Sequence, residues 1–287
     1  MRLKDERLAW AEAKLRECRR IALRYAGTRD LRVEHKPDRS PVTIADRTIE
    51  AHLRRELARA FPGEAIVGEE FGASSGVGSS FWTIDPIDGT RAFTRGLPSW
   101  GILLGRIEEG KAVLGACDFP VIGTFLGVGP GTPAYERRGD QRIRLAHARK
   151  PPTLSQAIIF HGGSRWWAPT RYAKGFARLV HTCYLERAYG DCYAYLWVFR
   201  GQVEAILDYG VKIWDLAPFA ALASATGRVL SDCSGHPSFT GPEAILAHPA
   251  LARQIVNILR TDVRRQKSEV RKHGTRTTDF NNLSSDF

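Results

Sequence analysis

Cysteines are few in this chain, and their placement excludes two ways of stabilising a protein. The 287 residues include five cysteines, an odd number, and no two of them form a Cys-x-x-Cys pair. Single cysteines far apart build neither a disulfide framework nor a structural zinc site. We therefore expect buried free thiols. The five positions are Cys18, Cys117, Cys183, Cys192 and Cys233.

Long apolar runs are also missing. No stretch approaches the roughly 20 apolar residues that a membrane helix needs. The first seven residues carry acids and contain no apolar segment of the kind found in signal peptides. We therefore expect no membrane partner and a cytoplasmic location. With 43% apolar and 25% charged residues, the composition is that of a globular protein with a sizeable core.

A compact basic cluster is absent, although the formal net charge is +11. The excess of Lys and Arg is spread along the chain, is not interleaved with aromatic residues, and matches no nucleic-acid-binding motif. Solvated helix faces and a solvated tail explain it, so we expect no nucleic-acid partner. The charge leaves one alternative open, a non-catalytic or nucleic-acid-binding protein, which steeply salt-dependent binding would reveal.

Apolar periodicity predicts the elements of the first half. Residues 3–25 and 43–61 repeat apolar side chains at helical spacing, so each predicts an amphipathic helix, with a polar loop between them. Short apolar runs separated by Gly-containing turns follow and predict strands, the last three in an antiparallel meander. These strands cover residues 65–67, 81–84, 102–107, 112–117 and 124–128.

The second half alternates between the two periodicities. We predict one unit over residues 1–260, made of an α+β half to about residue 150 and an α/β half after it. Residues 261–287 are polar and poor in apolar side chains, which predicts a disordered tail. The predicted strands cover 157–161, 184–186, 203–208, 228–231 and 244–246, and the predicted helices 171–180, 191–200, 215–226 and 249–259.

Four acidic residues fall where predicted strands end or helices begin. Glu69 follows a strand, Asp85 ends the next strand, Asp88 comes three residues later, and Asp215 opens an apolar helix. Such positions gather ligand-binding groups in sheets covered by helices. Mg²⁺ prefers carboxylate oxygens, and carboxylates crowded in one cleft would repel each other without cations. Two such ions can clamp the attacking and leaving oxygens of a phosphoryl displacement.

The run Asp-Pro-Ile-Asp-Gly-Thr at residues 85–90 is the most specific of these signals. As a tight turn it could let both acids bridge two cations. Gly89 would let a phosphate approach the backbone, and a helix that begins at Gly89 and Thr90 would direct free N–H groups toward it. Taken alone, Asp215 could be a helix N-cap and Glu69 part of a solvated turn.

Three segments together resemble the metal-site motifs of the inositol monophosphatase-like family of Mg²⁺-dependent phosphatases. They are Gly68–Glu70, Asp85–Thr90 and Trp214–Ala217, in the order and spacing of the family, and the likeness covers residues 5–260. The resemblance implies an α+β fold of α-β-α-β-α layers. It also implies a homodimer that hydrolyses a small phosphorylated metabolite with activated water and without a covalent phosphoenzyme.

The resemblance also implies roles for single residues. Two or three Mg²⁺ ions would bind per site, the first to Glu69, Asp85 and the Ile87 carbonyl, the second to Asp85, Asp88 and Asp215, and a weaker third sharing Glu69. Asp46 and Thr90 would orient the nucleophilic water, with Glu69 also catalytic, while Gly89 and Thr90 would bind phosphate through N–H groups. Lys36 would lie in a mobile loop that shields the metals. Without the resemblance, Asp46 is an ordinary first-turn acid of a helix.

The substrate is predicted from a finer likeness. Residues 69–72, 90–101 and 187–191 resemble the histidinol-phosphatase branch of the family. Arg187, Asp191 and Asp215 would contact the substrate, and the carboxylate of Asp191 suits the ammonium group of histidinol phosphate. Asp191 could instead be an N-cap. Inositol 1-phosphate, fructose 1,6-bisphosphate and an adenosine bisphosphate stay open as alternative substrates.

A phosphatase with an aspartyl nucleophile is a further alternative, because enzymes similar to haloacid dehalogenases also place two acids before Gly-Thr. Their acids lie two residues apart, whereas Asp85 and Asp88 lie three apart. The spacing therefore favours metal ligands over a nucleophile.

Overall fold

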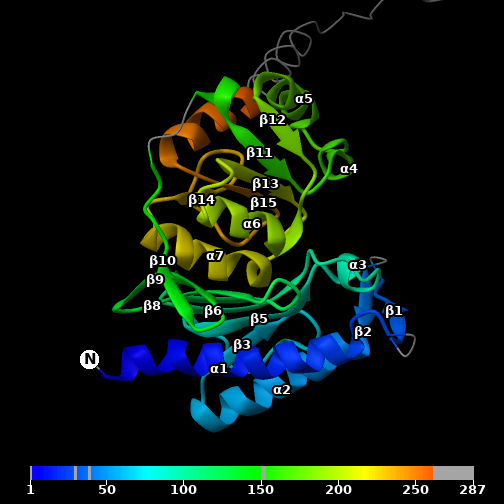
Figure 1. Ribbon diagram of the computed structural model, residues 1–287, viewed down its shortest axis with the longest axis vertical. Coiled ribbons are helices and arrows are strands. Elements are labelled where there is room, and N and C mark those ends of the chain that lie inside the picture. Colours follow the sequence, from blue (N-terminus) through cyan, green and yellow to red (C-terminus); the bar gives the residue numbers. More distant parts are fainter. Residues whose placement is uncertain (1, 29–30, 38–39, 150–152, 261–287) are drawn as a thin grey trace, which may run out of the picture.

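The computed structural model describes residues 2–28, 31–37, 40–149 and 153–260. Helices and sheets alternate in layers along the long axis of the molecule (Figure 1). The layered α-β-α-β-α sandwich expected from the resemblance is confirmed. The predicted disorder of residues 261–287 lies outside the described residues. Within the described part, no helix is long and apolar enough to cross a membrane.

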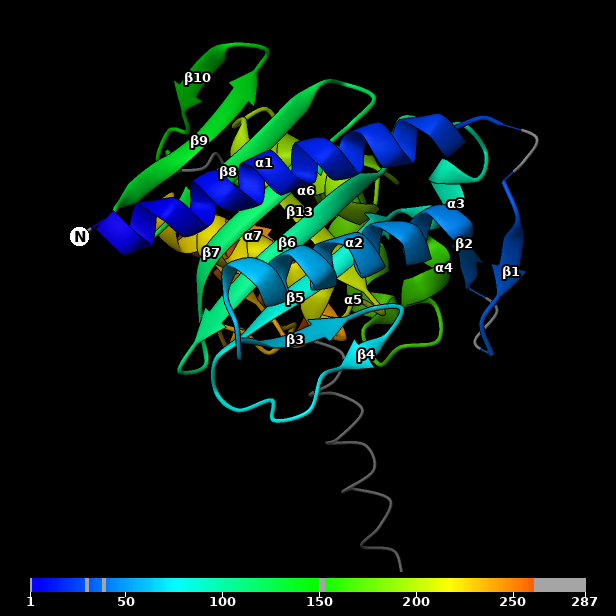
Figure 2. The same cartoon turned by 90° about the horizontal axis from the view of Figure 1, so that it is seen from below.

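The first layer consists of the two predicted amphipathic helices, α1 (Arg2–Tyr25) and α2 (Ile44–Ala60). They lie side by side on one face of the larger sheet (Figure 2), and their apolar stripes are buried there. Between them the chain forms a short antiparallel hairpin of β1 (Val33–His35) and β2 (Pro41–Thr43). The sequence predicted only a polar loop here, because the three exposed residues of β1 have no apolar alternation.

The second layer is an eight-stranded sheet in which only β3 and β5 run parallel. The predicted antiparallel meander is confirmed and extends over two further strands, β9 and β10, whose charged residues hid them from an apolar pattern. The strand order is β10-β9-β8-β7-β6-β5-β3-β4. The strands are β3 (Ala65–Gly68), β4 (Gly72–Ala73), β5 (Phe81–Asp88), β6 (Gly101–Glu108), β7 (Lys111–Phe119), β8 (Thr124–Gly129), β9 (Thr132–Arg138) and β10 (Gln141–Arg144).

Strand β5 corrects one prediction. The sequence placed its end at Asp85 and a tight turn between Asp85 and Asp88, but the strand continues to Asp88. Asp85 pairs with Leu103 and Asp88 with Gly101, so β5 carries one extra residue in a bulge. The bulge accommodates Pro86, which has no N–H for the ladder, and it redirects the side chains at the end of the strand.

The third and fourth layers are two helices and a five-stranded sheet. Helices α6 (Asp191–Phe199) and α7 (Ile213–Ala225) lie between the sheets, and a large apolar core surrounds them. Helix α7 begins two residues earlier than predicted, which makes Asp215 its third residue. The strand order is β12-β11-β13-β15-β14. The strands are β11 (Ile158–His161), β12 (Leu185–Arg187), β13 (Ala205–Tyr209), β14 (Val229–Ser231) and β15 (Glu243–Ala247).

The last layer covers the outer face of the smaller sheet with its own apolar core. All five cysteines are free thiols, as predicted, and only Cys183 is partly exposed. The short helix α3 (Thr90–Phe93) begins next to Gly89, where the sequence predicted a helix start. The covering elements are η1 (Leu154–Gln156), α4 (Ser164–Trp167), α5 (Ala173–Thr182) and the helix over residues 249–260.

Candidate active site

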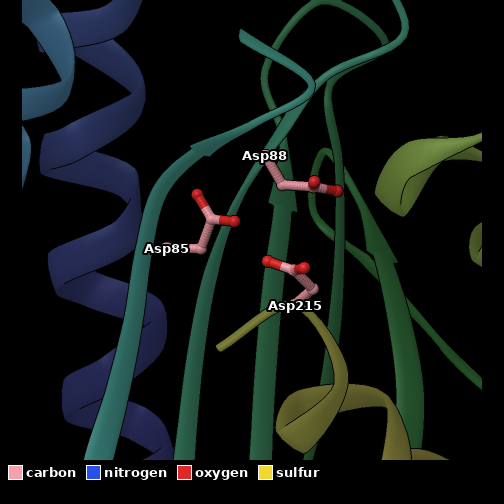
Figure 3. A group of neighbouring side chains, drawn as sticks. All are labelled: Asp85, Asp88 and Asp215. Atoms are coloured by element: carbon pink, nitrogen blue, oxygen red, sulfur yellow. The ribbon is translucent and has the colours of Figure 1, made fainter. Parts of the chain in front are cut away.

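Three of the predicted acids meet at one point. Asp85 and Asp88 lie at the bulged end of β5, and Asp215 lies in the first turn of α7, so the larger sheet and the middle helix layer contribute together (Figure 3). One carboxylate oxygen from each residue falls within 4.8 Å of the others. The Asp215 carboxylate also accepts the Lys212 N–H at 2.7 Å, so this acid closes the first turn of its helix as well.

The electrostatics of this cluster favour a cation. Withdrawal from water raises the pKa of Asp85, and the charges of Glu69 and Asp88 raise it further. The same withdrawal raises the pKa of Asp215 to about 7. Within the described part, the buried Asp85 Oδ1 has no hydrogen-bond partner. Oxygen ligands from crowded carboxylates fit a hard divalent cation, which would give this oxygen a partner and keep the acids ionised.

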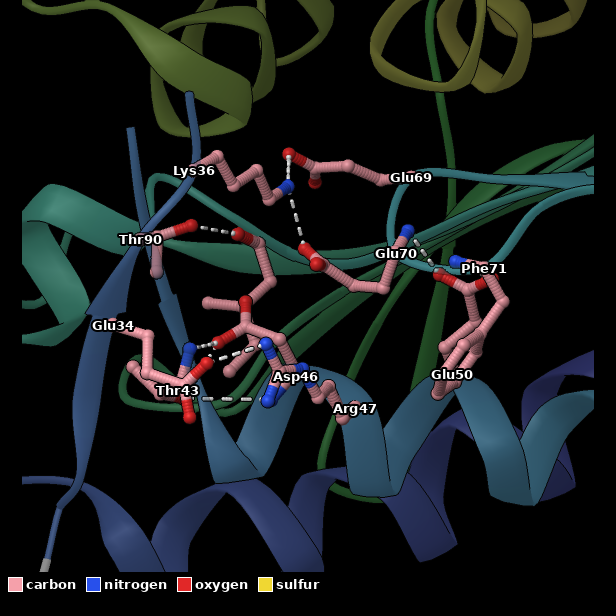
Figure 4. A network of polar contacts seen from close by, with 11 residues as sticks. Glu34, Lys36, Thr43, Asp46, Arg47, Glu50, Glu69, Glu70, Phe71 and Thr90 are labelled. Atoms are coloured by element: carbon pink, nitrogen blue, oxygen red, sulfur yellow. Dashed lines mark hydrogen bonds and ion pairs between the residues drawn. The ribbon is translucent and has the colours of Figure 1, made fainter. Parts of the chain in front are cut away.

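Glu69 approaches the same cavity from the turn after β3. Its Oε1 accepts the Lys36 ammonium at 2.7 Å, and the same ammonium reaches Glu70 Oε1 at 2.8 Å (Figure 4). Glu69 is not among the three acids whose oxygens lie within 4.8 Å, but all four line one cavity. Lys36, which lies between α1 and α2, therefore balances part of the negative charge of Glu69 and Glu70 on this side of the cavity.

Glu50 on α2 holds this turn and was missed by the sequence analysis. Its carboxylate accepts the N–H groups of Glu70 at 2.7 Å and Phe71 at 3.1 Å. It packs so closely that a Cβ added to Gly68 would lie 2.0 Å from Glu50 Oε1, which explains the glycine before Glu69. The available signal was a spacing of four between Asp46, Glu50 and Arg54, which puts all three on one helix face beside the apolar stripe.

Gly89 brings the backbone close to the cluster. Its φ of 84° is left-handed, and an added Cβ would lie 2.8 Å from the Ser99 carbonyl oxygen and 3.3 Å from Asp191 Oδ2. A side chain at this position would therefore be strained and would narrow the cavity. The next residue, Thr90, donates its hydroxyl to the Ile87 carbonyl at 3.0 Å. Both Gly89 and Thr90 line the cavity, as does Ile87.

Asp46 lies behind this group, in the first turn of α2. Its Oδ2 accepts the Thr43 N–H at 2.7 Å and the Thr43 hydroxyl at 2.5 Å (Figure 4). Burial raises the pKa of Asp46 to about 6, and the hydrogen bonds from Thr43 oppose that rise. In the described structure the Asp46 carboxylate is hydrogen-bonded to Thr43 and not to Thr90. The predicted cooperation of Asp46 with Thr90 therefore stays a prediction.

The far end of the cavity contains further polar groups. Asp191 is solvent-accessible at the start of α6, and the N–H of its neighbour Cys192 donates to Asp88 of the acidic cluster. Asp208 on β13 is buried, which raises its pKa, and the charge of Asp191 adds to the rise. The buried Tyr195 hydroxyl has no hydrogen-bond partner among the described residues.

These groups share one cavity of about 570 Å³ with the acidic cluster and with the aromatic rings of Trp166 and Tyr209.

Helix α6 is capped by Gly190 without a side-chain bond, so Asp191 is its first residue and not its N-cap. Arg187 is exposed at the end of β12, donates to the Glu186 carbonyl at 2.7 Å, and is not among the described lining residues. Its predicted contact with substrate stays a prediction.

Comparison with known proteins identifies the family. The family model described as the inositol monophosphatase family matches residues 4–266. This chain belongs to the inositol monophosphatase family. It is a phosphatase that hydrolyses phosphate monoesters, and the family is generally metal-dependent. The match to this family disfavours the alternative of a phosphatase similar to haloacid dehalogenases.

Individual relatives are similar over most of their length. A histidinol-phosphatase of Mycobacterium tuberculosis is 31% identical and covers 81% of this chain and 90% of the relative. An inositol-1-monophosphatase, ImpA of Mycolicibacterium smegmatis, is 32% identical over 76% and 80%. An IMPase structure from Thermotoga maritima superposes with a TM-score of 0.78 at 24% identity, over 91% of this chain and 99% of that one.

Proposed function

We propose that this phosphatase uses Mg²⁺ to hydrolyse histidinol phosphate to histidinol and phosphate, a reaction of histidine biosynthesis. The observation that carries the proposal is the pair of carboxylates, Asp191 and Asp208, in the cavity wall outside the metal cluster. The alcohol part of histidinol phosphate carries an ammonium group, on the carbon next to the phosphate-bearing CH2, and an imidazole beyond it. Inositol phosphate offers only neutral hydroxyls there. Three relatives named histidinol-phosphatase, at 29–32% identity, support the choice.

The metal end of the cavity would hold the cations. Asp85, Asp88, Asp215, Glu69 and the Ile87 carbonyl offer the oxygen ligands that Mg²⁺ prefers. When bound, Mg²⁺ neutralises the phosphate and lowers the pKa of a coordinated water. Lys36, which now compensates Glu69 and Glu70, would share these carboxylates with a cation.

The phosphate would lie at Gly89 and Thr90. The left-handed backbone of Gly89 leaves room for it, and N–H groups at the start of α3 would donate to its oxygens. The Thr90 hydroxyl, which donates to Ile87 in this structure, would rotate to orient the attacking water. The buried Asp46 lies behind it in α2 and would accept a hydrogen bond or a proton.

The leaving group would extend toward α6 and β13. A cationic group there meets two carboxylates, and a charged hydrogen bond contributes about 1.5–3 kcal/mol. The unpartnered Tyr195 hydroxyl would hydrogen-bond the same part of the substrate. Trp166, in the wall of the cavity, is nearly half exposed and would cover an imidazole ring.

A phosphate-release panel tests the proposal. The purified chain is assayed with Mg²⁺, and again with EDTA, on histidinol phosphate, inositol 1-phosphate, fructose 1,6-bisphosphate and 3′-phosphoadenosine 5′-phosphate. We expect Mg²⁺-dependent release with the highest kcat/KM for histidinol phosphate. A higher kcat/KM for inositol 1-phosphate would reject the substrate assignment, and equal release in EDTA would reject the metal dependence.

We further infer a cytoplasmic homodimer, as predicted from the sequence. Light scattering during gel filtration gives the mass of the particle. A mass of one chain, 32.0 kDa, would contradict the dimer.

A further inference from the structure

A second cavity lies beside the residues that follow β10 and the turn that precedes β14. Its volume is about 460 Å³, and none of its lining residues belongs to the cavity of the candidate active site. The linker after β10, the end of α6, the turn before β14 and the start of the helix over residues 249–260 surround it. Its charged and titratable lining residues are Arg149, Arg200, Arg228, His147, His248 and Glu204.

Arg228 is the unusual member of this lining. Its guanidinium donates to two backbone carbonyls, Val198 at 2.9 Å and Ala146 at 3.3 Å, and lies 5.6 Å from the ring centre of Phe199. The two carbonyls accept some of the guanidinium N–H groups, but neither the carbonyls nor the ring carries a negative charge that would balance the cation. Among the described residues no carboxylate lies within ion-pair distance of it, and its partial burial lowers its pKa. A partly desolvated cation without a counter-ion is costly, and an anion in the adjoining cavity would relieve that cost.

The other charges at this cavity do not supply the counter-ion. Arg200 is already paired with Glu136 at 2.5 Å. Glu204 is the acid among the described lining residues. Its carboxylate accepts the Ile158 N–H at 2.7 Å, which directs it toward the start of β11. The cavity therefore keeps a positive excess.

A third cavity shows that arginines alone do not make such a site. It lies beside α1 and contains Arg16, Arg19 and Arg137, but each of these is paired. Arg19 pairs with Asp118 at 2.5 Å, and Arg16 and Arg137 pair with Glu12. Each arginine there has a carboxylate within ion-pair distance, whereas Arg228 has none among the described residues.

We propose that the cavity beside Arg228 binds a tetrahedral oxyanion, either free phosphate or the phosphate group of a small metabolite. Arg228 and Arg149 would supply the positive charge. The Nδ1 atom of His248 accepts the Ala250 N–H at 3.1 Å, so the neutral ring carries its proton on Nε2, where it can donate to an anion. Guanidinium and ring N–H groups suit phosphate oxygens in both charge and geometry.

Calorimetric titration with inorganic phosphate tests this site. The D85N variant in EDTA is used throughout, because it lacks both the cations and one acid of the active site. We expect one phosphate site per chain in this background, and binding about tenfold weaker or worse when R228M or R149M is added. R16M is the matched control, because it removes an arginine that already has an acid partner, and it should leave phosphate affinity unchanged. Sodium chloride at equal ionic strength corrects for general screening.

A second titration distinguishes the two sources of the anion. Phenylphosphonate, which cannot be hydrolysed, should bind more tightly than phosphate if the site takes a phosphorylated metabolite, and no more tightly if it takes free phosphate. If R228M fails to fold, R149M decides, since Arg149 is exposed. The proposal is overturned if the D85N chain binds no phosphate, or if R149M binds it as strongly as its parent.

Discussion

The two ends of the active-site cavity are built in different ways. The metal end takes Asp85 and Asp88, which lie three positions apart on one strand, and adds Asp215 from the first turn of one helix. The opposite end takes Asp191 from α6 and Asp208 from β13, with aromatic rings from other segments. The first is a short motif set by a β-bulge, and the second exists only once the two sheets have packed together.

This difference explains how one family can serve several substrates. The chain is 31% identical to a protein named histidinol-phosphatase and 32% identical to one named inositol-1-monophosphatase, so overall identity does not separate the two activities. We propose that the chemistry depends on the motif, whereas selectivity depends on single residues spread over the second half. Single substitutions at the two ends of the cavity can separate these two roles.

The largest effect is expected at the metal end. D88N removes one carboxylate of the cluster, and losing several kcal/mol of charge stabilisation should lower kcat/KM by about 10³-fold for every substrate. The metal-free variant should nevertheless unfold at a higher temperature than the parent, because one of the mutually repelling acids is gone. Steady-state kinetics and thermal unfolding measure the two changes. The exposed D140N variant is the control, and an active D88N enzyme would refute the role of the cluster.

Changes at the opposite end should be selective. D191N and D208N each remove a negative charge from the leaving-group side, so each should lower kcat/KM for histidinol phosphate by about 10- to 100-fold. For inositol 1-phosphate kcat/KM should fall by less than about threefold. The measured quantity is therefore the ratio of kcat/KM for histidinol phosphate to kcat/KM for inositol 1-phosphate. If D191N impairs both substrates equally, Asp191 serves to hold the turn beside Asp88 and does not select the substrate.

A smaller effect is expected for Glu50, which acts through the turn at Glu69. E50Q keeps the shape of the side chain but weakens its bonds to the N–H groups of Glu70 and Phe71. The Mg²⁺ concentration for half-maximal activity should rise about tenfold, as for other residues that support metal ligands, with kcat at saturating Mg²⁺ retained. E56Q on the same helix is the control. A fall in kcat with unchanged Mg²⁺ dependence would contradict a positioning role.

Glu50 also shows the limit of prediction from sequence. Apolar periodicity predicted most helices and strands, whereas the layers of the fold and the cluster of Asp85, Asp88 and Asp215 were expected from the resemblance of three short segments to a family. Glu50 looked like one more charge on an amphipathic helix, because its partners lie twenty residues away in a turn. The bulge in β5 was missed for a related reason, since it depends on pairing with β6. Asp208 was missed because a single acid inside an apolar strand has no local signal.

The smallest expected effect is a pH dependence of stability that belongs to the metal end. Withdrawal from water raises the pKa of Asp215 to about 7, well above its value in the unfolded chain, so the folded metal-free protein binds more protons than the unfolded one between about pH 4 and pH 7. Its stability should therefore fall as the pH rises through this window.

Mg²⁺ competes with those protons for the carboxylates of the cluster. It should therefore stabilise the fold most at a pH where these acids are ionised. We expect the Mg²⁺-induced rise in unfolding temperature to be larger at pH 8 than at pH 5.5 by about 5 °C. D118N is the control, because burial also raises the pKa of Asp118 to about 6, but this acid pairs with Arg19 outside the cavity. D118N should keep the difference between the two pH values, and D215N should reduce it. An equal Mg²⁺ effect at both pH values would mean that the acids of the cluster do not exchange protons for cations, and the contrast between the two ends of the cavity would then rest on geometry alone.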